Sequence, residues 1–204
     1  MKIYFIRHAH VAYDTELGNR YKVEHYKEHL TPLGWAQALE LDYLLDQSKI
    51  QFEAIYSSDY CRAVETIVPF SARTKLSIKE TAFLRELQVK GKSADFLKMA
   101  KQDFNYRNFG GESINEASAR LKGFITSLSS QHSATASLIL VTHGILLQSL
   151  FSTVFNRPEI EPTWPDVYSV GLQGDNFVNL KQETDLVPFN NTKHDRLNLY
   201  PEFK

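Results

Sequence analysis

The chain has 204 residues, of which 43% are hydrophobic and 23% are charged. These proportions are typical of a globular protein, and the length suits a single domain. The formal net charge is -1, so no global field attracts nucleic acid or an anionic membrane, and we expect neither as a partner. Cys61 is the single cysteine and cannot form an internal disulfide. Without a signal segment or a membrane-spanning apolar run, the expected location is cytoplasmic.

Short apolar runs with the length and composition of strands occur along the whole chain. They predict strands at residues 2–6, 52–58, 76–79, 137–142, 167–173 and 176–182. The run at 137–142, SLILVT, is the most continuous of them. The last two runs are joined by Gly174-Asp175, which is typical of a hairpin turn.

Apolar residues with helical spacing predict helices between these strands. The predicted helices run from Pro32 to about 47, from Ser57 or Ser58 to about 70, from Ser113 to about 130, and over 145–155. Thr31-Pro32 and the capping box between Ser113 and Glu116 mark two of the starts. Residues 9–30 are expected to form a polar loop, residues 84–112 a small cap or insertion with a broken helix, and the last twenty residues a surface segment.

Because strands alternate with helices, the predicted fold class is α/β with a mostly parallel central sheet, in one domain over 1–204. Ligands of such sheets bind at the carboxyl ends of the strands. Arg7-His8 follows the first predicted strand, Ser58 and Arg62 follow the second, and His143-Gly144 follows the strand at 137–142. The sequence therefore predicts that these groups converge at one edge of the sheet.

This combination of side chains indicates a phosphate site. The guanidinium forks of Arg7 and Arg62 match phosphate oxygens in geometry and charge. Helix N-termini behind Ser58 and Gly144 would add backbone N–H groups that favour an anion.

Two histidines beside such a phosphate indicate phosphoryl transfer. A neutral histidine ring nitrogen can attack phosphorus near pH 7, and nearby arginines disfavour the imidazolium form. A second histidine can stabilise the transferring oxygens. A carboxylic acid must then protonate the leaving oxygen and later activate water, and Glu86 is the best candidate.

Five motifs in order resemble those of the histidine phosphatase (phosphoglycerate mutase-like) superfamily. They are Arg7-His8, Ser57-Ser58-Asp59-Tyr60-Cys61-Arg62-Ala63-Val64-Glu65-Thr66, Leu84-Arg85-Glu86, Gly110-Gly111-Glu112-Ser113 and Val141-Thr142-His143-Gly144, and Thr31-Pro32-Leu33-Gly34 also fits. Each motif alone is weak, but five in the family's order over residues 2–155 are a strong signal.

The resemblance implies a three-layer α/β/α sandwich and a phosphohistidine enzyme that uses no metal and no other cofactor. The roles that it implies are nucleophile for His8, phosphate clamp for Arg7 and Arg62, second histidine for His143, proton donor for Glu86, and supporting contacts for Ser58 and the Gly144 backbone.

The sequence departs from the family's pattern directly after the first histidine. The family usually has Arg-His-Gly followed by an acidic residue and Thr or Ser, whereas here Ala9, His10 and Val11 follow His8. Asp14 stands where many members have an Asn that contacts the phosphate. A carboxylate there is unfavourable unless it is protonated, turned away or paired with a substrate cation. We expect Asp14 to contact the substrate and His10 to line the pocket entrance.

The predicted function is a metal-independent phosphomonoester hydrolase acting on a small phosphorylated metabolite, such as a sugar phosphate or a nucleotide. A phosphoglycerate mutase-type phosphoryl transferase is the first alternative. Mutases of the family have a longer, strongly basic insertion with paired arginines, and the segment after Glu86 has lysines but no such pair.

Two further alternatives belong to other classes of protein. His8, His10, Asp14 and His143 are residue types that bind divalent metals, but two arginines in the same site would repel the ion. A catalytically silent phospho-ligand-binding protein is the other alternative, because Ala9 and Asp14 depart from the family's pattern. A homodimer is a possible assembly, on which the sequence is silent.

Overall fold

The computed structural model describes residues 1–12, 27–87 and 111–188. The strands are β1 (Lys2–Arg7), β2 (Phe52–Ser58), β3 (Ile78–Thr81), β4 (Ser137–Thr142), β5 (Val167–Gln173) and β6 (Asn176–Gln182). The helices are α1 (Pro32–Gln47), α2 (Cys61–Thr74), α4 (Ile114–Leu128) and α5 (Gly144–Phe155), with short 3-10 turns η2 (Ala82–Leu84) and η4 (Thr184–Leu186).

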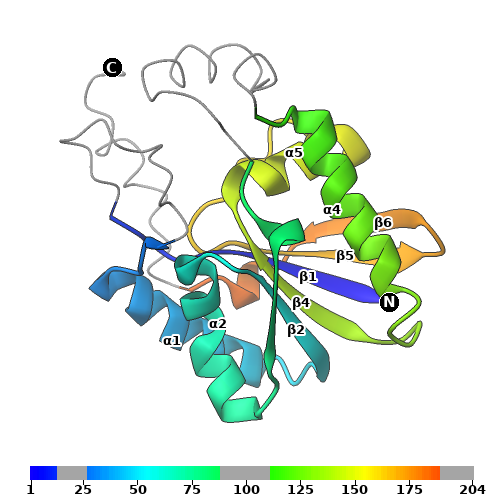
Figure 1. Cartoon of the computed structure of the whole chain (residues 1–204). Coiled ribbons are helices and arrows are strands. Elements are labelled where there is room, and N and C mark those ends of the chain that lie inside the picture. Colours follow the sequence, from blue (N-terminus) through cyan, green and yellow to red (C-terminus); the bar gives the residue numbers. More distant parts are fainter. Residues whose placement is uncertain (13–26, 88–110, 189–204) are drawn as a thin grey trace.

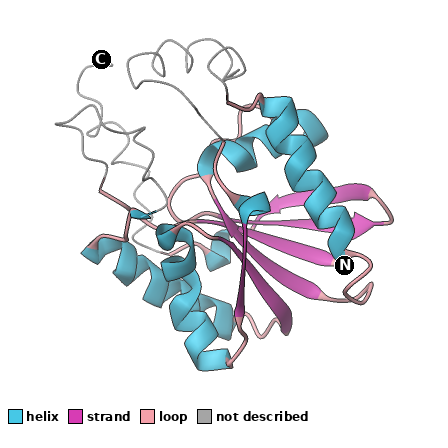
Figure 2. Cartoon of the chain, viewed as in Figure 1, coloured by secondary structure: helices cyan, strands magenta, loops and turns pink. Residues whose placement is uncertain are grey.

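The strands form one six-stranded sheet in the order β3-β2-β4-β1-β5-β6. The pairs β3·β2, β2·β4 and β4·β1 are parallel, whereas β1·β5 and β5·β6 are antiparallel. Helices α1 and α2 cover one face, and α4 and α5 cover the other (Figures 1 and 2). The predicted three-layer α/β fold with a mostly parallel sheet is therefore confirmed.

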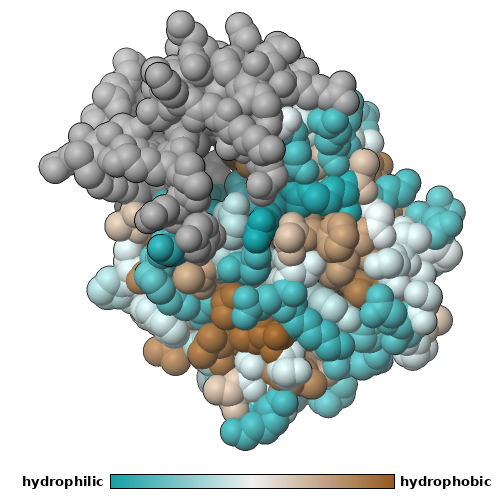
Figure 3. Space-filling view, in the orientation of Figure 1, coloured by the Kyte–Doolittle hydropathy of each residue, from teal (hydrophilic) through white to brown (hydrophobic). Residues whose placement is uncertain are grey.

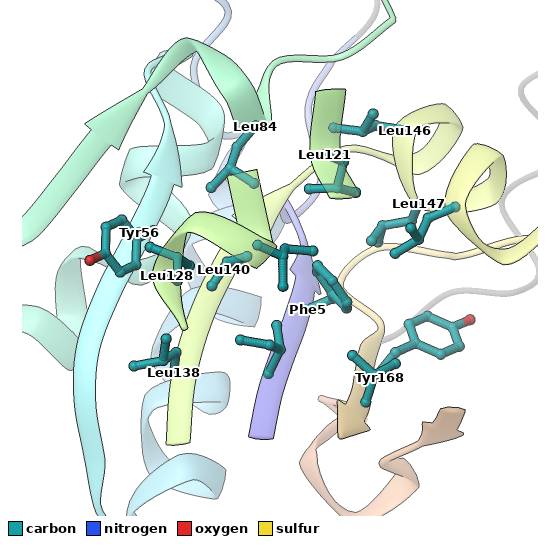
Figure 4. Packing of buried hydrophobic residues seen from close by; sticks show 14 of the residues in the cluster. Phe5, Tyr56, Leu84, Leu121, Leu128, Leu138, Leu140, Leu146, Leu147 and Tyr168 are labelled. Atoms are coloured by element: carbon teal, nitrogen blue, oxygen red, sulfur yellow. The ribbon is translucent and has the colours of Figure 1, made fainter. Parts of the chain in front are cut away.

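The alternation of side chains along β1 builds a separate core on each face of the sheet. Ile3 and Phe5 pack with the buried residues of α4 and α5, several of which Figure 4 shows. Tyr4 and Ile6 point the opposite way and pack with α1 and α2. Since β1 is apolar on both faces, it can only be a central strand, which places its carboxyl end in the middle of the sheet edge.

Two of the predicted helix starts are confirmed in their capping contacts. The Thr31 hydroxyl accepts a hydrogen bond from the Gly34 N–H at 3.1 Å, at the start of α1. Ser113 and Glu116 form the reciprocal capping box at the start of α4. These local signals succeed because their partners lie within the same turn.

Two other boundary predictions were wrong. Ser57 and Ser58 do not cap α2, because both still belong to β2; the cap residue is Tyr60, and it makes no side-chain cap bond. The third strand lies at Ile78–Thr81 rather than at 76–79, because parallel pairing with β2 sets Ile78 opposite Ile55. Tertiary pairing determines these ends, which local propensity does not capture.

Hydrophilic side chains and smaller hydrophobic patches are interspersed on the face shown in Figure 3. In the part of the chain that the structure describes, the exposed large apolar side chains are Trp35, Leu39 and Tyr43 on α1, and Phe83. Among the described residues, no helix has both the length and the apolarity that a membrane span requires. Most of the predicted cap and of the predicted loop over 9–30 lies outside the described residues.

Candidate active site

Three strand ends meet at one edge of the sheet, as the alternation of elements predicts. In the parallel pair β1·β4, Arg7 lies opposite Thr142, and β2 runs alongside β4 with Ser57 opposite Val141. The residues that follow directly, His8 and His143, therefore become neighbours, with their ring centroids 5.1 Å apart.

His8 is 2% exposed, and its Nδ1 lies 2.8 Å from the carbonyl oxygen of Ala9. A carbonyl can only accept, so Nδ1 carries the proton and Nε2 keeps its lone pair. Burial, and then the positive charges of Arg62 and Arg7, hold the pKa of His8 well below its usual range. The ring is therefore neutral at physiological pH, with Nε2 as its nucleophilic atom.

His143 is fully buried and is held by both of its ring nitrogens. Arg62 donates from Nη2 to His143 Nδ1 at 3.2 Å, and a guanidinium cannot accept. The proton is therefore on Nε2, which donates to the Ser58 hydroxyl at 2.9 Å. Burial, followed by the charges of Arg62 and Arg7 and the neighbouring His8, lowers the pKa of His143 well below its usual range.

Arg62 extends from the first turn of α2 into the centre of the site. Its side chain is 6% exposed, and its Nη1 donates to the carboxylate of Glu28 at 3.1 Å. The guanidinium also lies over the Tyr60 ring, 4.9 Å from its centroid. Arg62 thus binds His143 through Nη2 and Glu28 through Nη1. Glu28 does not belong to any of the predicted motifs.

Arg7 approaches from the opposite side and contacts the segment that precedes β5. Its Nη1 donates to the carbonyl of Pro162 at 2.6 Å, and its guanidinium lies 4.6 Å from the centroid of the Trp164 ring. A Cβ on Gly144 would lie 3.0 Å from Arg7 Cζ. The missing side chain at Gly144 therefore makes room for the guanidinium.

The side chain of Glu86 lies at the N-terminus of α5, the helix that begins at Gly144. One carboxylate oxygen accepts from Leu146 N at 2.8 Å and Leu87 N at 2.9 Å, and the other accepts from Ile145 N at 3.2 Å. The N–H groups of this helix end, which the sequence suggests for a phosphate, are thus bound to Glu86 in this structure. Their dipoles fix the carboxylate at the edge of the site.

The segment that carries Glu86 is tied to α4. Arg120 donates from Nη1 to the carbonyl of Phe83 at 2.6 Å, and from Nη1 and Nη2 to that of Arg85 at 3.2 Å. Its guanidinium also pairs with Glu112 at 2.7 Å. Glu112 of the predicted motif thus supports the segment of Glu86 through Arg120, whose role the sequence does not predict.

His10 belongs to the wall of the site rather than to its centre. Its Nδ1 lies 2.8 Å from the Thr31 hydroxyl, and its ring packs edge-on against Trp164. A Cβ on Gly34 would lie 2.2 Å from the His10 carbonyl oxygen, so the Thr-Pro-Leu-Gly motif allows α1 to pack closely here. Asp14, the other predicted substrate contact, lies outside the described residues.

The departures at Ala9 and Val11 are accommodated in the fold. Ala9 is fully buried, and its N–H donates to the Thr66 hydroxyl at 2.8 Å. Val11 is buried and forms an isolated antiparallel bridge with Leu30. The side chains of Ala9 and Val11 thus pack in a small apolar cluster with Ala38.

Two aromatic side chains complete the site, and the sequence analysis does not predict either. Tyr60 packs edge-on against His143 with ring centroids 5.1 Å apart, and Trp164 is tilted beside His8 at 6.5 Å. Tyr60 lies within a recognised motif, so its position gives a signal. Trp164 lies in an irregular segment that contains three prolines, where no hydrophobic periodicity predicts the position of its side chain.

The described residues suit an anion better than a cation. Buried Arg62 and partly buried Arg7 lie together with two neutral histidines. Among residues 1–12, 27–87 and 111–188, no cluster of three or more His, Cys, Asp or Glu side chains could hold a metal ion. Guanidinium groups and a histidine with an available Nε2 are the groups that bind and receive a phosphoryl unit.

The family model of the histidine phosphatase superfamily (branch 1) matches residues 3–170. The chain therefore belongs to this superfamily of enzymes. No curated protein matches the sequence.

Solved structures of similar fold cover most of the chain at low identity. A mycobacterial glucosyl-3-phosphoglycerate phosphatase has 20% identity and a TM-score of 0.72, over 89% of this chain and 96% of that one. YhfR of Bacillus stearothermophilus has 20% identity and a TM-score of 0.73, over 91% and 98%. A phosphoglycerate mutase from Bacillus anthracis has 20% identity and a TM-score of 0.69, over 91% and 93%.

Proposed function

We propose that the protein is a metal-independent phosphomonoester hydrolase that forms a phosphohistidine at His8, with a small phosphorylated metabolite as its substrate. The observation that carries the proposal is the hydrogen bond from His8 Nδ1 to the Ala9 carbonyl. It leaves Nε2 as the nitrogen with a lone pair, in a ring whose pKa is held low beside two arginines.

In the first step, His8 Nε2 attacks phosphorus and the bond from phosphorus to the leaving oxygen breaks. Arg7, Arg62 and His143 stabilise the charge on the transferring oxygens. Glu86, as the carboxylic acid, gives its proton to the leaving oxygen. These assignments rest on the family pattern and on the convergence of the strand ends.

In the second step, Glu86 as the carboxylate takes a proton from a water molecule, whose oxygen attacks the phosphohistidine. The bond between nitrogen and phosphorus breaks, which releases inorganic phosphate and returns His8 to its neutral form. Water as the acceptor is favoured over a second metabolite because the segment after Glu86 lacks the paired arginines of mutases.

The first test is hydrolysis of p-nitrophenyl phosphate between pH 5 and 8 with EDTA present, wild type beside His8→Ala. The expected result is metal-independent turnover that falls at least about a thousandfold in the variant, because its nucleophile is missing. The lowered pKa of both histidines predicts no loss of rate near pH 6.5 from their protonation.

An acid-labile phosphoryl label on wild type but not on His8→Ala would support the intermediate directly. Activity that chelator removes and zinc or manganese restores would overturn the proposal. Exchange of phosphate between two metabolites, without release into water, would favour the mutase instead. Light scattering at known concentration would test whether the protein forms the possible homodimer.

A further inference from the structure

Glu28 brings a negative charge directly to the proposed phosphate clamp. Its carboxylate Oε2 lies 3.1 Å from Arg62 Nη1, while the other terminal nitrogen of Arg62 reaches His143. The Glu28 side chain is 25% exposed and that of Arg62 is 6% exposed. The carboxylate is therefore the more solvent-exposed member of this ion pair.

The backbone next to Glu28 is fixed on two sides, so this carboxylate is a built part of the site. The Leu30 N–H donates to Glu65 of α2 at 2.8 Å, and His29 Nδ1 contacts the same carboxylate at 2.5 Å. Leu30 also forms a β-bridge with Val11, in the segment that follows β1 and His8. Glu28 is thus held between α2 and the segment that follows His8.

A fixed carboxylate at this point affects what the rest of a substrate can carry. The phosphoryl group brings negative charge to Arg7 and Arg62, and Glu28 offsets part of the positive charge of Arg62. A second anionic group near the phosphate would meet repulsion, whereas an ammonium group would be attracted. Even with solvent screening, unit charges a few ångströms apart change a binding constant by about tenfold.

We propose that Glu28 is a specificity-determining residue that favours phosphomonoesters with an ammonium group near the phosphate and disfavours those with a second anionic group. The proposal rests on the phosphatase function proposed above. It names a substrate class: amino-substituted alkyl phosphates in preference to phosphorylated acids or bisphosphates.

Three esters of similar size separate charge from shape: phosphoethanolamine with an ammonium group, ethyl phosphate without a second charge, and phosphoglycolate with a carboxylate. The measurement is kcat/KM of the full-length enzyme for each, at constant ionic strength with EDTA. We expect phosphoethanolamine to be the best substrate and phosphoglycolate the worst. Equal values for all three, or a preference for phosphoglycolate, would overturn the inference.

The matched variant is Glu28→Gln, which removes the charge and keeps the size. It should lower the ratio of kcat/KM for phosphoethanolamine to that for phosphoglycolate by about tenfold to a hundredfold, because lost attraction and relieved repulsion multiply. Asp175→Asn, at the tip of the β5–β6 hairpin, removes a carboxylate elsewhere and should leave the ratio unchanged. Higher salt should narrow the ratio in wild type, which tests the charge effect without any variant.

The two proposals fail in different ways. If wild type hydrolyses p-nitrophenyl phosphate but Glu28→Gln leaves the ratio unchanged, the specificity role is wrong and the phosphatase function stands. If wild type hydrolyses neither p-nitrophenyl phosphate nor any of the three esters, the proposed function is wrong, and the inference falls with it.

Discussion

Replacing Gly144 by alanine would place a methyl group against the Arg7 guanidinium. The new Cβ would lie 3.0 Å from Arg7 Cζ and 3.1 Å from Nε, closer than ordinary van der Waals contact. Arg7 cannot retreat without loss, because it is bonded to the Pro162 carbonyl and stacked on Trp164. The guanidinium must therefore move by a few tenths of an ångström within the proposed phosphate clamp.

Two effects on stability oppose each other in this variant. Alanine is favoured over glycine within a helix by about 1 kcal/mol, and overpacking costs about 1 kcal/mol or more. With an overpacking cost of about 1–3 kcal/mol, the free energy of unfolding should therefore fall by about 0–2 kcal/mol. Catalysis has no such compensation, because a small misplacement of a positioning group costs about tenfold to a hundredfold in rate.

The assay is kcat/KM for p-nitrophenyl phosphate together with thermal unfolding, and Gly123→Ala is the matched control. Gly123 also lies in a helix, α4, but a Cβ there would meet nothing within 4 Å. The control should gain about 1 kcal/mol of stability and keep its activity. If Gly144→Ala matched Gly123→Ala in kcat/KM, the reasoning about Arg7 would be refuted.

Two further predictions concern carboxylates. Glu86→Gln should slow turnover of alkyl phosphates at least about tenfold more than that of p-nitrophenyl phosphate, whose leaving group needs little protonation; equal losses would show that Glu86 is not the acid. Burial alone would raise the pKa of Glu183, but hydrogen bonds from Lys181, Ser169 and Lys2 lower it from 4.5 to about 2. The hydrogen bonds to the Glu183 carboxylate therefore stabilise the folded state fully above pH 4.5, and this stabilisation is lost as pH falls towards 2. Glu183→Gln should lower the free energy of unfolding in urea by about 1–2 kcal/mol at pH 7 and by little near pH 2. An equal cost at both pH values would contradict the assignment.

The sequence predicts the sheet well because its central strands are apolar on both faces. SLILVT and KIYFI have no other place in a folded chain than between two layers of helices. Once these strands are parallel neighbours, the meeting of His8 and His143 follows from topology alone. The fold and the convergence of the histidine residues were thus accessible before any coordinates.

The contacts of these residues are less predictable, because they depend on partners that are distant in sequence. The sequence offers Ser57 or Ser58 as a helix cap and Ser58 as a supporting contact in the site, but it does not predict that the Ser58 hydroxyl binds His143, 85 residues away. Glu28 and Trp164 reach the site from irregular segments, in which no periodicity predicts the direction of a side chain. Local patterns thus locate the reacting groups, whereas three-dimensional packing selects the residues around them.

The antiparallel half of the sheet has a consequence for the synthesis of the protein. His8 is made before β4 and β5, and β1 pairs on one side with β4 and on the other with β5. Arg7 donates to the carbonyls of Pro162 and Asp166, just before β5. The apolar strand that precedes His8 therefore stays unpaired on both edges until β4 and β5 have been made. A nascent chain that stops before Pro162 would carry every proposed catalytic side chain and still lack the residues that hold Arg7.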